Sequence, residues 1–292
     1  MLARFFTRLI DAQGIWARPL GGFVQRILKA IFGPLHLVKD FLNGKWLGHS
    51  LHAALSDLPI GIYTLVLVFD VLGQREAAGI ALFLGILAHA AAAVAGFADY
   101  TDTDGRPRMV ATVHSTLMSV AIVIYIASLV MRSNSGDQTV PIVLSFVGYG
   151  LVTAGAYVGG EVAYTLGNMV NRHAWRFMGA GKWQALDVTE IAEGVPVKAK
   201  AGALTLVLVR YGETIHALHD TCAHAGGPLS EGTIVDGCIE CPWHGSRFEL
   251  VTGYRKRSPT TYDQPRFEVR VSESGGWEAR RVTSGSAGTG EH

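Results

Sequence analysis

Four long apolar runs dominate the first part of the chain, at about residues 51–72, 77–98, 109–131 and 140–160. The last three contain no Asp, Glu, Lys or Arg, and the first contains only Asp57 and Asp70. A hydrocarbon core about 30 Å thick requires roughly 20 residues of α-helix. Because the connections between the runs are short, the pattern predicts four membrane-spanning helices in an up-and-down bundle.

The first 48 residues mix apolar residues with regularly spaced basic ones, as in FVQRILKAIF and LHLVKDFL. This pattern is typical of helices that lie flat in a membrane interface. An ordinary amphipathic helix packed on the bundle is the alternative. The basic start has no short apolar core followed by a small-residue cleavage site, so we expect it to be retained.

The pattern changes after residue 182 to short runs rich in β-branched residues, separated by Gly, Pro and Asp, such as LTLVLVR, TIVDGCIE and RFEVRVSE. Runs of this kind predict a compact antiparallel β domain. The predicted fold is therefore multidomain, with a four-transmembrane-helix α bundle followed by a small all-β domain. The predicted parts are an interfacial segment 1–48, a four-helix domain 49–165, a linker 166–182, a β domain 183–282 and a disordered polar tail 283–292.

Composition and charge place the chain at a membrane. Charged residues make up 17% of the chain, its mean hydropathy is positive, and its net charge of +1 implies no nucleic acid partner. Lys and Arg concentrate before the first run, between the second and third, and after the fourth, whereas the opposite connections hold only Arg75 and Arg132. The positive-inside rule then predicts an integral protein of a bacterial cytoplasmic membrane, in contact with the lipid bilayer, with both termini and the β domain cytoplasmic.

Three cysteines, Cys222, Cys238 and Cys241, lie close together in the β domain. An odd number argues against a disulfide framework, and reduced thiols are typical of the cytosolic side. In an extended strand Cys238 would point away from Cys241, so we interpret it as a small buried hydrophobic residue.

Two cysteines and two histidines form a spaced pattern, Cys222-x-His224 followed after sixteen residues by Cys241-x-x-His244. Zinc is one candidate, because two Cys and two His can make a closed tetrahedral site. A zinc finger, however, groups its cysteines together and its histidines together. Here each pair supplies one thiolate and one imidazole, which suits a two-iron cluster whose irons have different ligands.

The residues around this pattern support that interpretation. CAH followed by GGPLSEG, and then CPWHG, resembles the Rieske [2Fe–2S] family, and the similarity covers roughly residues 183–280. The resemblance implies that Cys222 and Cys241 ligate the inner iron. It implies that His224 and His244 ligate the outer, more exposed iron.

Differences within the family narrow the expected branch. Rieske subunits of quinol-oxidising complexes join the two loops by a disulfide, and the matching positions here are Gly227 and Trp243. The chain therefore resembles the ferredoxin-like, oxygenase-associated branch. Ser246 stands where high-potential members have a hydroxyl donor near the cluster, but Phe248 replaces their second donor, a tyrosine. We predict a potential in the lower to middle part of the Rieske range of about −150 to +300 mV.

Two histidines, His89 and His114, fall inside the apolar runs, where an ionisable side chain is costly. Three interpretations stay open: axial ligands of a haem b, a quinone or proton site that also involves His52 and Asp99, or hydrogen bonds that join helices. The runs also resemble an uncharacterised four-helix bacterial membrane family that is sometimes fused to a Rieske domain, on the residues LHAALSDLPIGI, GFADY and GGEVAYTLGN.

These features predict a membrane-anchored iron–sulfur protein that transfers single electrons on the cytoplasmic side, as the electron-transfer component of an oxidoreductase system. Its partners would be a redox protein donor or acceptor and a haem or quinone in the bundle. The alternatives are a membrane-bound redox sensor and a quinone oxidoreductase. A terminal Rieske oxygenase is excluded, because it needs a mononuclear iron site with two histidines and a carboxylate. His292 is the only histidine after His244 in the sequence.

Overall fold

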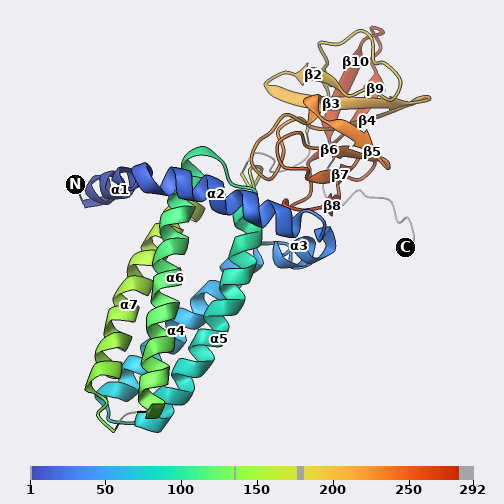
Figure 1. The fold of residues 1–292 in the computed structure, drawn as a ribbon. Helices are drawn as coiled ribbons and strands as arrows, with labels where there is room; N and C mark the ends of the chain where they lie inside the picture. Colours follow the sequence, from blue (N-terminus) through green and yellow to red (C-terminus); the bar gives the residue numbers. More distant parts are fainter. Residues whose placement is uncertain (1, 135, 176–180, 283–292) are drawn as a thin grey trace. The chain divides into compact units, whose positions relative to one another are not determined.

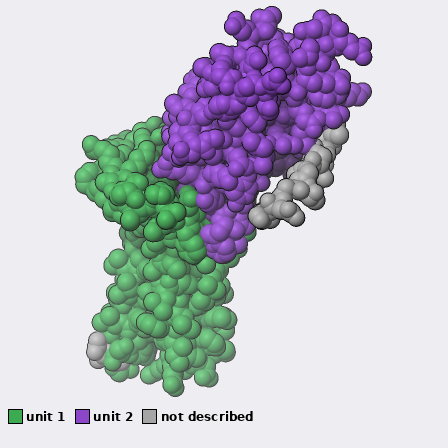
Figure 2. All heavy atoms as spheres, turned by 90° about the vertical axis from the view of Figure 1, so that its right-hand side faces the viewer, with its two compact units in different colours: residues 1–44, 49–168 green, residues 45–48, 169–292 purple. Residues whose placement is uncertain are grey.

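The chain folds as two compact units in a computed structural model that describes residues 2–134, 136–175 and 181–282. The first unit contains Met1–Gly44 and His49–Asn168, and the second contains Lys45–Gly48 and Met169–His292 (Figure 2). The predicted tail 283–292 and residues 176–180 of the predicted linker lie outside the described residues.

Four long helices form the body of the first unit (Figure 1). They are α4 Leu51–Val71, α5 Arg75–Tyr100, α6 Gly105–Asn134 and α7 Thr139–Gly160, followed by a π-helical turn Glu161–Thr165. All four are long and apolar enough to cross a membrane, as predicted. Each helix packs on the next, and α7 packs back on α4, so that α4 and α6 face each other across the bundle diagonal.

Local sequence explains where α4 and α6 begin and where α4 ends. The Ser50 hydroxyl accepts the amide hydrogen of Ala53 at 3.2 Å, which caps the start of α4. Gly73, with a φ of 70°, follows its last turn in the left-handed conformation that glycine adopts freely. Helix α6 begins at Gly105, four residues before the apolar run. Pro107 suits its first turn, because amide hydrogens in the first turn have no partner within the helix and proline has none to lose.

One ion pair joins the two halves of the bundle. Arg132 on α6 donates to both carboxylate oxygens of Asp70 on α4, at 2.7 and 2.6 Å. The side chains of both residues are almost fully buried, at 5% and 1% exposure. The pair therefore neutralises two charges within the apolar helices.

The N-terminal segment is helical, as its pattern predicts, with α1 Leu2–Ala12, α2 Gly14–Phe32 and α3 His36–Leu42. These helices leave large apolar side chains exposed: Phe5, Leu9, Ile15, Trp16, Leu20, Phe23, Ile27, Ile31, Leu37, Val38 and Phe41. Exposed apolar side chains next to basic residues are what a helix in a lipid interface requires. Placement of the segment in that interface stays a prediction.

The second unit consists of two antiparallel sheets, which confirms the predicted all-β domain (Figure 1). The six-stranded sheet has the order β1-β10-β9-β4-β3-β2, and the four-stranded sheet has the order β5-β6-β7-β8. The strands of the first sheet are β1 Gln184–Ala185, β2 Val197–Ala201, β3 Leu204–Tyr211, β4 Thr214–His219, β9 Arg266–Val271 and β10 Trp277–Arg281. Those of the second are β5 Thr233–Val235, β6 Cys238–Glu240, β7 Arg247–Glu249 and β8 Arg255–Arg257, and a 3₁₀ turn, Leu229–Glu231, precedes β5.

Strand β3 is buried on both faces and contributes to two hydrophobic cores. Leu206 and Leu208 pack in one core, while Val207 and Val209 pack in the other, because successive side chains of a strand point to opposite faces. The second core also contains Phe248 and the predicted ligands Cys222 and Cys241: its buried members are Val207, Val209, Leu218, Cys222, Ala223, Leu229, Ile239, Cys241, Phe248 and Leu250. The thiols of the candidate site are thus anchored in the core of the unit.

Candidate functional site

Two loops with the same backbone pattern carry the candidate ligands. The first follows β4 and the second joins β6 to β7. In each loop the cysteine amide donates to the carbonyl five residues later, at 2.9 Å for Cys222 and 2.8 Å for Cys241. Each cysteine carbonyl accepts from the amide four residues later, at 3.0 Å in both loops. That fourth residue is Gly226 or Gly245, and both have a positive φ, 89° and 75°, which favours glycine.

The two thiols are buried and hydrogen-bonded to each other. Cys222 is 1% exposed and Cys241 is 3% exposed. The pKa of Cys241 falls to about 7 because the Cys222 thiol donates to its sulfur. The pKa of Cys222 rises well above its usual value because the thiol donates this bond and is buried. In both loops, the amides two and three residues after the cysteine also donate to its sulfur, which favours a negatively charged sulfur.

The two imidazoles, each two or three residues after its cysteine, are neighbours in space. The ring centroids of His224 and His244 are 5.0 Å apart, and the ring planes are nearly perpendicular, at 87°. His244 is half-buried, but His224 is only 4% exposed, close to the values of the cysteines. The greater exposure that the resemblance implies for the outer ligands is therefore seen at His244 and not at His224.

The donor set and the space between the loops fit a two-iron cluster. The two thiols lie next to each other and the two imidazoles lie next to each other, and a two-iron cluster with unlike irons takes its ligands in such pairs. A Cβ on Gly227 would lie 2.9 Å from the sulfur of Cys241. The absence of a side chain at this glycine keeps the space beside that sulfur open.

Trp243 and Gly227, the positions matched to the disulfide of quinol-oxidising relatives, are neighbours in the structure. A Cβ on Gly227 would lie 2.9 Å from two atoms of the Trp243 indole. The indole itself is 58% exposed. The indole of the second loop therefore packs on a glycine of the first loop, and more than half of Trp243 stays open to solvent.

Ser246, Phe248 and Cys238 complete the set of predicted residues. The Ser246 hydroxyl is fully buried and accepts the amide hydrogen of Thr260 at 3.1 Å, which leaves its own hydrogen available to donate. Phe248 packs in the core that holds both candidate cysteine ligands. Cys238 is buried on β6, and its burial raises the pKa of its thiol.

A glutamine far from the motif in sequence holds the first loop, and the sequence analysis did not identify it. The Gln264 amide donates to the carbonyls of His219 and Thr221 at 2.6 and 2.7 Å. Its oxygen accepts the amide hydrogen of Ala223 at 3.0 Å. One side chain thus fixes both ends of the segment that carries Cys222. No local signal in the sequence marks this role.

Part of the predicted linker also packs on the first loop. The Arg172 amide donates to the carbonyl of Ala223 at 3.3 Å, and its guanidinium donates to the carbonyl of His224 at 3.4 Å. The His173 ring is within 2.8 Å of the Thr221 carbonyl. These contacts place the segment beside the backbone of the first loop, from Thr221 to His224.

The membrane histidines have different partners from those the sequence suggests. The rings of His114 and His52 are neighbours, with centroids 6.0 Å apart. His89 instead forms a hydrogen bond with the hydroxyl of Tyr63 at 3.2 Å. The structure therefore pairs His114 with His52, which the sequence analysis names in the quinone or proton site, and not with His89.

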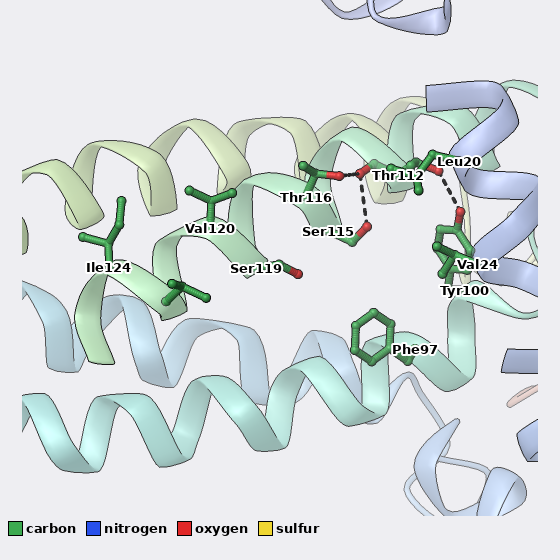
Figure 3. A pocket seen from close by; sticks show the side chains of 11 residues that line it. Leu20, Val24, Phe97, Tyr100, Thr112, Ser115, Thr116, Ser119, Val120 and Ile124 are labelled. Atoms are coloured by element: carbon green, nitrogen blue, oxygen red, sulfur yellow. Dashed lines mark hydrogen bonds between the residues drawn. The ribbon is translucent and has the colours of Figure 1, made fainter. Parts of the chain in front are cut away.

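A groove of about 470 Å³ lies between α2, α5 and α6 (Figure 3). Its described lining contains none of the three membrane histidines. The side chains that line it are Leu20, Val24, Phe97, Tyr100, Thr112, Ser115, Thr116, Ser119, Val120, Val123 and Ile124. The hydroxyls of Ser115 and Thr116 already donate to the carbonyl of Thr112, so they add little polar recognition.

Comparison with known families gives one match in each part of the chain. Residues 181–268 match the family described as Rieske [2Fe-2S] domain. Residues 48–172 match the family described as Predicted membrane protein (DUF2231).

Known proteins of similar sequence include ferredoxins. The anthranilate 1,2-dioxygenase ferredoxin subunit of Burkholderia cepacia is 34% identical over 91 residues, which cover 31% of this chain and 84% of that protein. Ferredoxin CarAc of Metapseudomonas resinovorans is 43% identical over 74 residues, which cover 25% and 69%. A solved complex of reduced oxygenase and oxidized ferredoxin in carbazole 1,9a-dioxygenase contains a chain that is 34% identical, with a TM-score of 0.29 and coverage of 34% and 92%.

Proposed function

Because the chain belongs to the Rieske [2Fe–2S] family and carries a DUF2231 membrane domain ahead of its Rieske domain, we propose that it is a membrane-anchored electron carrier. The cluster supplies the chemistry when bound, since it accepts and releases one electron at a time. The observation that carries the proposal is the pair of matched loops that bring two thiols and two imidazoles together. The four apolar helices provide the anchor.

Cys222 and Cys241 are the proposed thiolate ligands, and His224 and His244 are the proposed imidazole ligands. The amides that donate to each sulfur hold the thiolates and spread their negative charge. Ser246 is proposed to add a hydroxyl donor on the cluster side. Phe248 can add no hydrogen bond, which supports a potential below the upper end of the Rieske range.

The exposed edge of the site is the proposed face for electron exchange with a redox protein. His244 is half-buried and Trp243 is largely exposed, whereas His224 is buried. A partner that docks at His244 would reach the cluster through one imidazole. The similar ferredoxins belong to dioxygenase systems, so an oxygenase or a reductase is the proposed class of partner.

We propose that the Rieske domain lies on the cytoplasmic side of the membrane. The support is the excess of Lys and Arg at the bundle end where α4 begins and α7 ends. A haem or quinone in the bundle is the proposed membrane-side carrier. Its support is the set of buried and half-buried histidines on α4, α5 and α6.

Electron paramagnetic resonance of the purified, reduced full chain tests the ligand assignment. We expect a rhombic signal with a low average g-value. Replacing one imidazole by a thiolate, in His244→Cys, should move the average g-value toward that of a plant-type ferredoxin or remove the signal. His216→Cys, on the neighbouring strand β4, is the matched control and should leave the spectrum unchanged. An unchanged spectrum in His244→Cys would refute the assignment.

Turnover distinguishes a carrier from a redox sensor. A carrier should pass electrons repeatedly from a ferredoxin reductase to an excess of cytochrome c, at a rate that depends on the cluster. A sensor needs only to change oxidation state once. If the cluster is reduced but supports no steady-state reduction of any added acceptor, the electron-carrier proposal is wrong.

A further inference from the structure

The four long helices contain an internal repeat. The hairpin of α6 and α7 reproduces chemically distinctive residues of the hairpin of α4 and α5. The offset is 62 residues between α4 and α6, and 63 residues between α5 and α7. The matched pairs are His52 and His114, Tyr63 and Tyr125, Gly85 and Gly148, and Gly96 and Gly159.

The repeated histidines make the same contacts in both hairpins. The Nδ1 atom of His52 lies 2.8 Å from the carbonyl oxygen of Ala92 on α5. The Nδ1 atom of His114 lies 2.8 Å from the carbonyl oxygen of Gly155 on α7. In each hairpin the ring packs on the glycine four residues further along, Gly96 or Gly159. A Cβ on that glycine would lie 2.8 or 3.0 Å from ring atoms. Each imidazole is therefore held by a backbone carbonyl and packs on a glycine of the neighbouring helix.

The carbonyl contact fixes the chemistry of each ring. A carbonyl oxygen can only accept, so Nδ1 carries the hydrogen, and Nε2 of the neutral ring keeps its lone pair. Within the described part of the chain, neither Nε2 makes a hydrogen bond. A hydrogen bond from Nδ1 to a carbonyl is also how proteins orient a histidine that binds a metal through its other nitrogen.

The two rings meet across the bundle diagonal at a separation that suits a shared metal. Their centroids are 6.0 Å apart, and their planes make an angle of 75°. Two metal–nitrogen bonds of about 2.0–2.1 Å, together with the two ring radii, give a centroid separation between about 5 Å for a tetrahedral angle and about 6.5 Å for opposite nitrogens, a range that includes the observed value. Both rings are half-buried, so the site is not closed to an incoming group.

The next pair along the diagonal fills the bundle axis below the histidines. Tyr63 and Tyr125 are fully buried and stacked, with centroids 3.8 Å apart and planes at 15°. A Cβ on Gly85 would lie 2.7 Å from the Tyr63 ring, and one on Gly148 would lie 2.9 Å from the Tyr125 ring. The axis is therefore packed with aromatic rings at this level, while the level of His52 offers two nitrogen lone pairs.

We propose that His52 and His114 bind one metal centre through their Nε2 atoms, at the end of the bundle from which α7 leads into the Rieske domain. The site requires a metal with two coordination positions open to imidazole. Either the iron of a haem or a free transition-metal ion of the kind that imidazole binds meets this requirement. His89 is outside this site, because its ring lies against the ring of Tyr63, with centroids 6.0 Å apart, and is not part of the His52–His114 ring pair.

The test measures metal in the purified full chain beside the Rieske cluster. Haem is read from the pyridine haemochrome spectrum, and copper, zinc and nickel from elemental analysis. Iron is compared with acid-labile sulfide, because a [2Fe–2S] cluster alone contains equal amounts of the two. Iron in excess of sulfide is therefore bound outside the cluster. A preparation with none of these metals is titrated with haemin and, separately, with Cu⁺ and with Zn²⁺. We expect one bound centre per chain.

The variants His52→Gln and His114→Gln should each weaken binding at least tenfold, and to a similar degree, because the repeat makes the two ligands equivalent. His89→Gln is the matched control and should retain the metal. Acid-labile sulfide and the Rieske magnetic signal should be unchanged in all three, so failure of this site is separate from failure of the cluster. The proposal is overturned if no added metal binds, if His89→Gln alone loses it, or if the variants only lower thermal stability.

Discussion

Gly227→Ala tests whether the space between the two loops is essential for the cluster. The added Cβ would lie 2.9 Å from the Cys241 sulfur and from two atoms of the Trp243 indole. Ordinary contact begins near 3.4 Å, so these neighbours must move by about 0.5 Å. Gly227 does not have a positive φ, and the effect is therefore steric and not a backbone cost. Overpacking of this kind costs about 1–3 kcal/mol.

The assay follows the cluster itself, through its visible circular dichroism during heating and through acid-labile sulfide per chain. We expect Gly227→Ala to lose sulfide or to release the cluster at a lower temperature. Gly226→Ala is the matched control, because its φ of 89° strains the backbone while its Cβ would meet nothing closer than 3.7 Å. It should cost about 1–2 kcal/mol and yet retain the cluster.

Removing the indole provides the second half of the experiment. Trp243→Ala eliminates two of the three close contacts, so Gly227→Ala combined with Trp243→Ala should recover part of the lost cluster. Such recovery is a coupling between neighbouring sites. Wild-type sulfide content and release temperature in Gly227→Ala would refute the reasoning. Equal losses with and without the indole would assign the collision to the sulfur alone.

Three further outcomes follow from single contacts. Arg132→Met leaves the buried Asp70 carboxylate without its partner and should lower the free energy of unfolding in detergent by about 3–5 kcal/mol, a loss that Asp70→Asn in the same chain should reduce. Burial raises the pKa of the Cys238 thiol and shields its sulfur, so iodoacetamide should alkylate it more slowly at pH 8 than it alkylates free glutathione; equally rapid labelling would contradict this. Arg172→Ala should speed amide hydrogen exchange at residues 221–224 and leave residues 241–246 unchanged, whereas equal exchange in both loops would show that the linker does not protect His224.

Much of the architecture can be predicted from the sequence, because helices and strands leave hydropathy patterns within short segments of the chain. The spanning helices follow from apolar runs without charges, and the strands follow from short β-branched runs. Local signals also explain why both pairs of candidate ligands could be named: each pair lies within four residues on a glycine-rich loop. The start of α6 was placed too late, because the polar first turn does not belong to the apolar run.

Contacts between distant segments are less predictable. Gln264 fixes the first loop from 42 residues beyond Cys222, and Arg172 reaches it from 50 residues before. The partnership of His52 with His114 depends on how two diagonal helices are rotated, which hydropathy does not specify. The matched histidines and tyrosines at an offset of 62 residues, and the matched glycines at an offset of 63, are nevertheless a signal in the sequence that a search for internal repeats detects.

The buried ion pair has a consequence for how the repeated hairpins assemble. Asp70 and Arg132 occupy equivalent positions of the two copies, yet they carry opposite charges. Two identical first hairpins, brought together around the same axis, would confront one carboxylate with another, and two identical second hairpins would confront one guanidinium with another. Only unlike copies neutralise each other, so the charge pattern directs each first hairpin to a second one and opposes the association of two like hairpins in a crowded bilayer.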